Sequence, residues 1–181
     1  MARRWRRRLR RGVMYTVMAG LLGGMTFGVR AEGDRLPLVS PRVRSSVPRI
    51  AALLTEASAR SNTFRGLVAS IENTDGIVYV EPGRCNHGVR ACLSLSITAA
   101  GRYRILRVMI DLATDMVALM ATIGHELRHA LEILAEPSVR TTEQAYLFYA
   151  REAPTSRDVF ETRAAIQTGL AVEQEIGRLR N

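Results

Sequence analysis

The order of apolar and polar residues divides the chain into helical, then strand-like, then again helical sequence. Apolar residues at helical spacing predict a helix over residues 47–61, and FRGLVASI predicts a second, short one. The β-branched run GIVYVEPG ends in proline and glycine, which is typical of a strand. Leu93, Leu95 and Ile97 alternate with hydroxyl-bearing residues, and AAG then turns the chain into RYRILRVMID. A hairpin is therefore expected.

Three helices are expected after this strand-rich middle. The first is TDMVALMATIGHELRHALEILAE, with Thr114 as its N-cap; it is apolar around most of its circumference, which predicts a buried central helix. The second is SVRTTEQAYLFYAREA. The last runs over residues 155–181 and opens with a capping box of Thr155 and Asp158. A small sheet flanked by helices indicates an α+β fold.

The net charge of +9 comes almost entirely from the start of the chain. The chain has no lysine, and eight of its 26 arginines lie in residues 1–31, which contain no acidic residue. Residues 32–181 carry 18 arginines against 17 acidic residues and are nearly neutral. No basic cluster with interleaved aromatic residues remains there, so a nucleic-acid partner is not expected.

Residues 1–31 have the features of a secretory signal peptide. An arginine-rich start precedes an apolar stretch over residues 12–29, and Val29 and Ala31 fit the positions before a cleavage site. The alternative is an uncleaved anchor that tethers the protein to a membrane. Either reading places the protein outside the cytoplasm, in the periplasm or secreted. Residues 32–46 contain two prolines and predict a linker or arm, and residues 47–181 form a single domain.

The two cysteines, Cys85 and Cys92, are close together in CNHGVRAC. In an oxidising compartment this pair predicts a disulfide. His87 lies between them, so a metal site of these three residues is an alternative, although the spacing fits no common zinc pattern.

The stretch GHELRHALE contains candidate metal ligands and a candidate general base. His125 and His129 are four residues apart and share one face of the predicted helix, so both imidazoles can bind one metal ion. Glu126 is displaced by one position and can serve as general base toward a water on that metal. Hydrolysis needs this arrangement, because the metal activates water and polarises a carbonyl while the glutamate moves the proton. The alternative is a pair of core histidines satisfied by hydrogen bonds.

GHELRHALE resembles the active-site helix of the zincin metallopeptidases, and the resemblance extends over residues 123–175. It implies a mainly antiparallel sheet, a bound Zn²⁺ and peptide-bond hydrolysis. A metzincin would continue with glycine at position 132 and histidine at 135, but this chain has Glu132 and Ala135 and no later histidine. The better match is the gluzincin type, in which a carboxylate from a later helix is the third ligand.

The resemblance places the third ligand at Glu161 in FETRAA, in the first turns of the last helix. Competing ligands are Glu132, Glu136, Asp158 and His87. Glu132 follows His129 by one turn and is better placed to orient an imidazole than to bind the metal. Many gluzincins have an aspartate four residues after the ligand glutamate, where this chain has Ala165. That support is then expected from Glu132, Asp111 or Glu173.

Other parts of an active site are less defined. Donors to a developing oxyanion are sought among Tyr103, Tyr146, Tyr149 and Arg128. The strand over residues 93–98 either receives an extended peptide along its edge or is an ordinary half-buried strand.

The sequence therefore predicts an extracytoplasmic zinc metallopeptidase of zincin-like fold that acts on a peptide or protein. A cell-wall amidase with the same metal chemistry is one alternative. The other is a non-catalytic binding or structural module whose zinc site is degenerate or purely stabilising.

Overall fold

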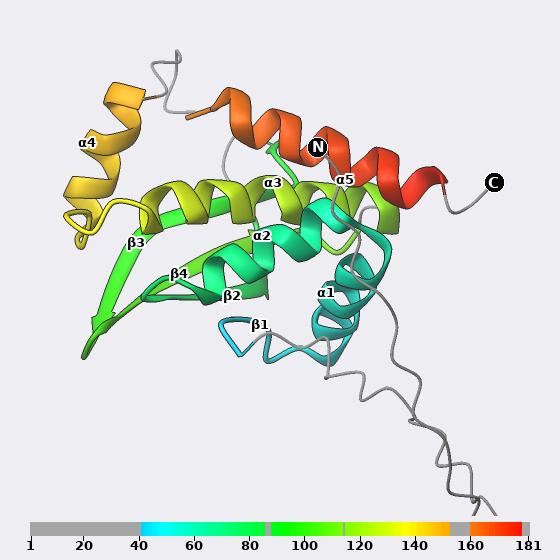
Figure 1. Cartoon of the computed structure of the whole chain (residues 1–181), viewed down its shortest axis with the longest axis horizontal. Coiled ribbons are helices and arrows are strands. Elements are labelled where there is room, and N and C mark those ends of the chain that lie inside the picture. Colours follow the sequence, from blue (N-terminus) through cyan, green and yellow to red (C-terminus); the bar gives the residue numbers. More distant parts are fainter. Residues whose placement is uncertain (1–40, 86–87, 114, 153–159, 179–181) are drawn as a thin grey trace, which may run out of the picture. The chain divides into compact units, whose positions relative to one another are not determined.

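The computed structural model describes residues 41–85, 88–113, 115–152 and 160–178. It has the predicted α+β architecture, shown in Figure 1. Its elements follow in the order β1 (Val43–Arg44), α1 (Pro48–Arg60), α2 (Asn62–Glu72), β2 (Gly76–Pro82), β3 (Ala91–Ala100), β4 (Tyr103–Ile110), α3 (Met116–Leu134), α4 (Thr142–Glu152) and α5 (Arg163–Arg178).

Several predicted features lie outside the described residues: the signal or anchor, the first part of the arm, His87, Thr114, and the capping box of Thr155 and Asp158. Within the segment predicted as an arm, Val43 and Arg44 form strand β1, and Val43 is buried. None of the helices in the described part of the chain has the length and apolar character needed to cross a membrane.

The four strands form a mixed sheet in the order β1-β2-β4-β3. Strands β3 and β4 form the predicted antiparallel hairpin, which turns at Gly101 with a φ of 59°. β1 and β4, however, both run parallel to β2, so the expectation of a mainly antiparallel sheet is wrong. The reason is that the chain passes from β2 to the outer strand β3 and returns beside β2 as β4. This path leaves β3 at the edge of the sheet.

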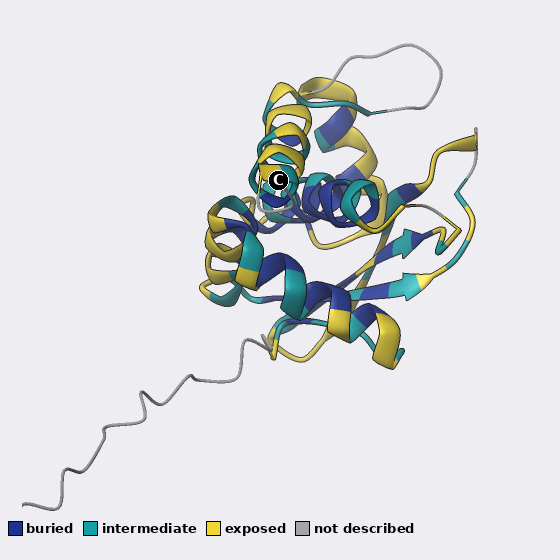
Figure 2. Cartoon of the chain, turned by 90° about the vertical axis from the view of Figure 1, so that its right-hand side faces the viewer, coloured by how far each residue is buried: buried dark blue, intermediate teal, exposed yellow. Residues whose placement is uncertain are grey.

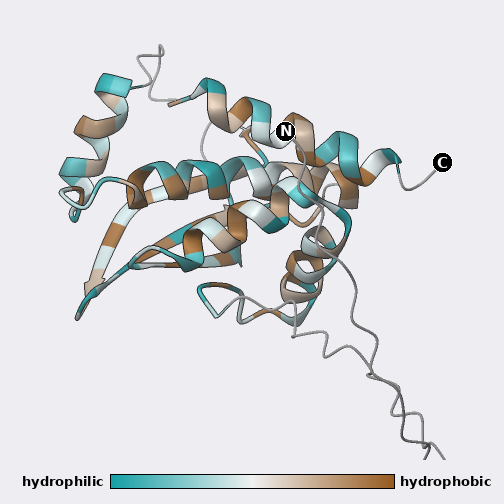
Figure 3. Ribbon diagram, in the orientation of Figure 1, coloured by the Kyte–Doolittle hydropathy of each residue, from teal (hydrophilic) through white to brown (hydrophobic). Residues whose placement is uncertain are grey.

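Helix α3 lies between the sheet and α5 and is the predicted central helix (Figure 1). Apolar residues run along most of its length (Figure 3), and Figure 2 shows buried residues where helices and sheet face one another. Leu119, Met120, Ile123 and Leu127 of this helix are fully buried. Burial of each large apolar side chain contributes roughly 1.5–3 kcal/mol, so α3 is anchored mainly by packing.

Two helix starts differ from those predicted. α3 begins at Met116, and its N-cap is Asp115, whose carboxylate accepts hydrogen bonds from the next helical N–H groups. α5 begins at Arg163 because the hydroxyl of Thr162 accepts a hydrogen bond from the Ala165 N–H and caps the helix there. Glu161 therefore lies just before α5 and not in its first turns.

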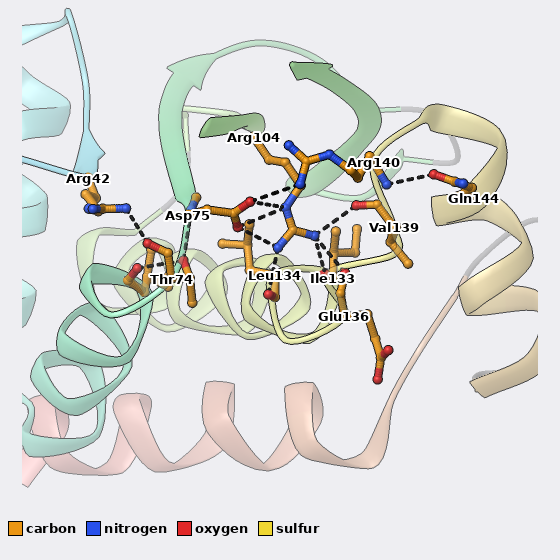
Figure 4. A network of polar contacts seen from close by, with 12 residues as sticks. Arg42, Thr74, Asp75, Arg104, Ile133, Leu134, Glu136, Val139, Arg140 and Gln144 are labelled. Atoms are coloured by element: carbon orange, nitrogen blue, oxygen red, sulfur yellow. Dashed lines mark hydrogen bonds and ion pairs between the residues drawn. The ribbon is translucent and has the colours of Figure 1, made fainter. Parts of the chain in front are cut away.

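The C-terminal end of α3 is held by a buried arginine. Arg104 of β4 is 1% exposed and forms an ion pair with Asp75 at 2.6 Å. Its guanidinium also donates to backbone carbonyls at and just after the helix end, those of Ile133, Leu134, Glu136 and Val139 (Figure 4). The last carbonyls of a helix lack the usual i+4 donors, so Arg104 adds a donor to each of these four and joins the end of α3 and the turn after it to the sheet.

Candidate metal centre

The side chains of His125, His129 and Glu161 come together beside α3. One ligand atom from each lies within 4.8 Å of the others. His125 Nε2 is 3.2 Å from Glu161 Oε2, and the centroids of the two imidazole rings are 4.9 Å apart. Two imidazoles and one carboxylate at such distances could hold a metal ion. The structure thus brings together the three residues that the sequence analysis selected as ligands.

The chemistry of these donors fits a cation. Glu161 Oε2 is buried but has no hydrogen-bond partner among the described residues. Burial lowers the pKa of His125, and the nearby His129 lowers it further, which favours the neutral imidazole that binds metals. A buried carboxylate oxygen facing a neutral imidazole nitrogen lacks a positive partner. A metal ion between them would supply it.

Glu132 contacts His129, the imidazole that it was expected to orient. Its Oε2 lies 3.2 Å from Nδ1 of His129, which leaves Nε2 of that imidazole for the metal. Its Oε1 accepts a hydrogen bond of 2.8 Å from the Thr162 hydroxyl. Burial alone would raise the pKa of Glu132, but the hydrogen bonds from His129 and Thr162 outweigh it, and the pKa is below its ordinary value. Glu132 is therefore an ionised acceptor and not one of the three clustered ligands.

Glu126 points from α3 toward the edge strand β3. Its Oε2 accepts a 2.7 Å hydrogen bond from the backbone N–H of Leu93, and its Oε1 is 4.0 Å from His125 Nε2. Burial raises the pKa of Glu126 to about 7, above the ordinary value of a carboxyl group. One oxygen is thus fixed by the sheet while the other faces the ligand cluster. This is the position that the sequence analysis gave to a general base.

Close packing of α5 against α3 brings Glu161 to the histidines. A Cβ added at Gly169 would lie 3.3 Å from the Cβ of His125 and 3.5 Å from the carbonyl oxygen of Ala121. Gly124, which precedes His125 in the chain, faces Val172 instead, at 3.0 Å from such a Cβ. The glycine that adjoins His125 is therefore Gly169, on the opposite helix.

The ligand cluster lies in a cleft of about 920 Å³. Strand β3 forms one wall from Ala91 to Leu95, and α5 forms another with Ile166 and Leu170. Both of these α5 side chains are about half exposed, so the wall presents apolar surface to solvent. Cys85 and Cys92 also line the cleft and are joined by a disulfide, as the sequence predicted, and not by a metal ion.

The remaining predicted site residues lie elsewhere or have other partners. Among the proposed oxyanion donors, only Tyr149 lines the described part of the cleft, and its hydroxyl donates to the His129 carbonyl. Arg128 donates to Glu132, and Asp111 accepts from the Ala113 N–H. Glu173 lines the cleft. Ala165 is buried.

Sequence reasoning missed three contributors: the Leu93 N–H, Gly169 and the Thr162 hydroxyl. The first two depend on tertiary contacts for which the sequence carries no signal. The sequence does carry a signal for Thr162, because threonine is a favourable N-cap residue. The prediction named only the capping box at residues 155–158.

Comparison with known proteins adds no relative: no family model, no curated protein and no solved structure matches the chain. The function is therefore inferred from the geometry of the cleft.

Proposed function

We propose that the protein is a zinc-dependent metallopeptidase in which His125, His129 and Glu161 hold the ion and Glu126 is the general base. The observation that carries this proposal is the position of the Glu126 carboxylate. It lies beside the ligand cluster with Oε1 at 4.0 Å from His125 Nε2, while Oε2 is held by the Leu93 N–H. A purely stabilising metal site does not need a carboxylate beside its ligands.

Two histidines, one carboxylate and a further open position are typical of catalytic zinc. The ion would polarise the scissile carbonyl and promote ionisation of water. Glu126 would accept the proton of the attacking water on Oε1 and later deliver it to the leaving amine. Its raised pKa suits a group that must both take up and release a proton near neutral pH.

A peptide is the substrate that suits the cleft. β3 is the edge strand of the sheet, and its residues Ala91–Leu95 line the cleft beside Glu126. An extended peptide can add to such an edge through backbone hydrogen bonds, which would carry its carbonyl past the ligand cluster. The apolar side chains of Ile166 and Leu170 would lie opposite.

The test is hydrolysis by the purified, zinc-loaded protein of fluorescein-labelled casein and of a library of internally quenched peptides. Glu126→Gln should bind zinc like the wild type but lose about 10²–10⁴-fold in rate. Equal rates for this variant and the wild type would contradict the assigned base. Zinc binding without cleavage of any probe would favour the non-catalytic alternative, and cleavage restricted to cell-wall peptides would favour the amidase.

A further inference from the structure

We infer that Thr162 is a positioning residue of the metal centre, whose hydroxyl couples the His129 ligand to the Glu161 ligand through Glu132. The inference rests on the proposed metal site and concerns how the chain assembles it. The Thr162 hydroxyl contacts Glu132 of α3 and the first turn of α5 at once.

The hydroxyl has one hydrogen and two groups to satisfy. Thr162 Oγ1 is 2.8 Å from Glu132 Oε1 and 3.1 Å from the Ala165 nitrogen. The Ala165 N–H can only donate, so the hydroxyl accepts there and has its own hydrogen free for the carboxylate. Thr162 therefore caps α5 and donates to Glu132 at the same time.

Glu132 links the Thr162 hydroxyl to the His129 ligand. The Thr162 hydroxyl holds one of its oxygens, and the other lies 3.2 Å from His129 Nδ1. A carboxylate fixed in this way holds the imidazole ring in one orientation, with Nε2 free for the ion. Arg128 approaches the same Glu132 oxygen at 3.4 Å, which is longer than the threonine contact.

The same residue fixes the position of the third ligand. Glu161 is joined to Thr162 by a peptide bond and lies on the non-helical side of the cap. Thr162 thus connects ligands from two segments that are far apart in the sequence, His129 on α3 and Glu161 before α5. The coupling arranges them before any ion binds and lowers the cost of ordering them on binding.

Three single variants of the full chain test this inference, with zinc affinity measured by competition against a chromophoric chelator. Thr162→Val keeps the shape but removes both hydrogen bonds, and should weaken zinc binding about 10–100-fold. Thr162→Ser keeps the hydroxyl and should restore affinity to within about threefold of the wild type. Thr168→Val is the matched control, because among the described residues that hydroxyl bonds to the Ala164 carbonyl of its own helix and to no group of the ligand cluster, and it should leave affinity unchanged.

A double-variant cycle separates positioning through Glu132 from simple loss of the helix cap. If Thr162 acts through Glu132, then Thr162→Val should have little further effect on affinity in a Glu132→Ala background. An equal loss in both backgrounds would overturn the coupling, as would wild-type affinity in Thr162→Val. Failure of the wild type itself to bind zinc would instead refute the metal site, and with it the proposed function.

Discussion

Helix α3 carries two polar clusters that differ in how their buried atoms are satisfied. At its C-terminal end, all three guanidinium nitrogens of Arg104 have acceptors, supplied by Asp75 and by backbone carbonyls. Beside its middle, Oε2 of Glu161, which lies just before α5, is buried without a hydrogen-bond partner in the described residues. The first cluster is satisfied within the protein, whereas the second leaves one buried carboxylate oxygen without a hydrogen-bond partner. A buried polar group that the chain leaves unsatisfied therefore indicates a ligand more strongly than burial alone.

The largest effect is expected from breaking the first cluster. Arg104→Met should lower the free energy of unfolding by about 3–5 kcal/mol, because it removes the buried guanidinium that pairs with Asp75 and bonds four backbone carbonyls. Urea denaturation in the presence of a metal chelator measures this loss. Arg107→Met on the same strand is the control: its side chain is 44% exposed and its ion pair with Glu81 is 3.7 Å long, so the change should stay below about 1 kcal/mol. Similar losses in both variants would contradict the structural role of Arg104.

Zinc should stabilise the second cluster, that of His125, His129 and Glu161. Free zinc at 100 times its dissociation constant should raise the free energy of unfolding of the wild type by about 2.7 kcal/mol. His129→Ala should gain almost nothing, whereas the Arg104 variant, if folded, should gain as the wild type does. Urea denaturation with and without zinc measures each gain. A wild-type gain that survives in His129→Ala would place the metal at another site.

The approach of α5 to α3 can be changed without touching a ligand. Gly169→Val should lower the free energy of unfolding by about 1–3 kcal/mol and weaken zinc binding, because its side chain would push α5 away from His125. Gly177→Ala on the same helix has open space and should be neutral or stabilising by up to about 1 kcal/mol. Thermal unfolding and chelator competition give the two readouts. Unchanged zinc affinity in Gly169→Val would show that the spacing of the helices does not control the site.

The smallest effect concerns acid stability. Burial alone would raise the pKa of Asp75, but the hydrogen bonds and charge of Arg104 outweigh it and lower the pKa below its ordinary value. The carboxylate therefore stabilises the fold fully above its unfolded pKa of about 3.9, and this contribution is lost as the pH falls through the lower, folded value. Asp75→Asn should be less stable at neutral pH and lose less on acidification. Urea denaturation at several pH values tests this, and parallel pH curves would refute it.

The sequence predicted most of the helices and strands because their periodicity is local. Strand alternation gave the β3–β4 hairpin, and the apolar circumference gave the central helix α3. The direction of β2 relative to β4 was not predictable in this way, because it depends on which strand lies at the edge. The start of α5 was misplaced because only Thr155 was considered as its N-cap, whereas the structure caps the helix with Thr162.

The candidate ligands were predictable because residue type and spacing along the chain identify possible metal ligands. His125 and His129 share a helical face, and Glu161 was chosen through the resemblance to gluzincins. The supports of the site were not predictable. Gly169 and the Leu93 N–H act through contacts between distant segments, and a backbone N–H or a glycine has no chemical signature in a sequence.

The most direct test is the metal content of the purified chain, measured by elemental mass spectrometry for the wild type, His129→Ala and Glu161→Ala. We expect about one zinc ion per wild-type chain, loss of zinc in His129→Ala and weakened retention in Glu161→Ala. Zinc retained fully in Glu161→Ala would contradict the assigned ligand set. No zinc after reconstitution, or iron in its place, would contradict the proposed zinc metallopeptidase.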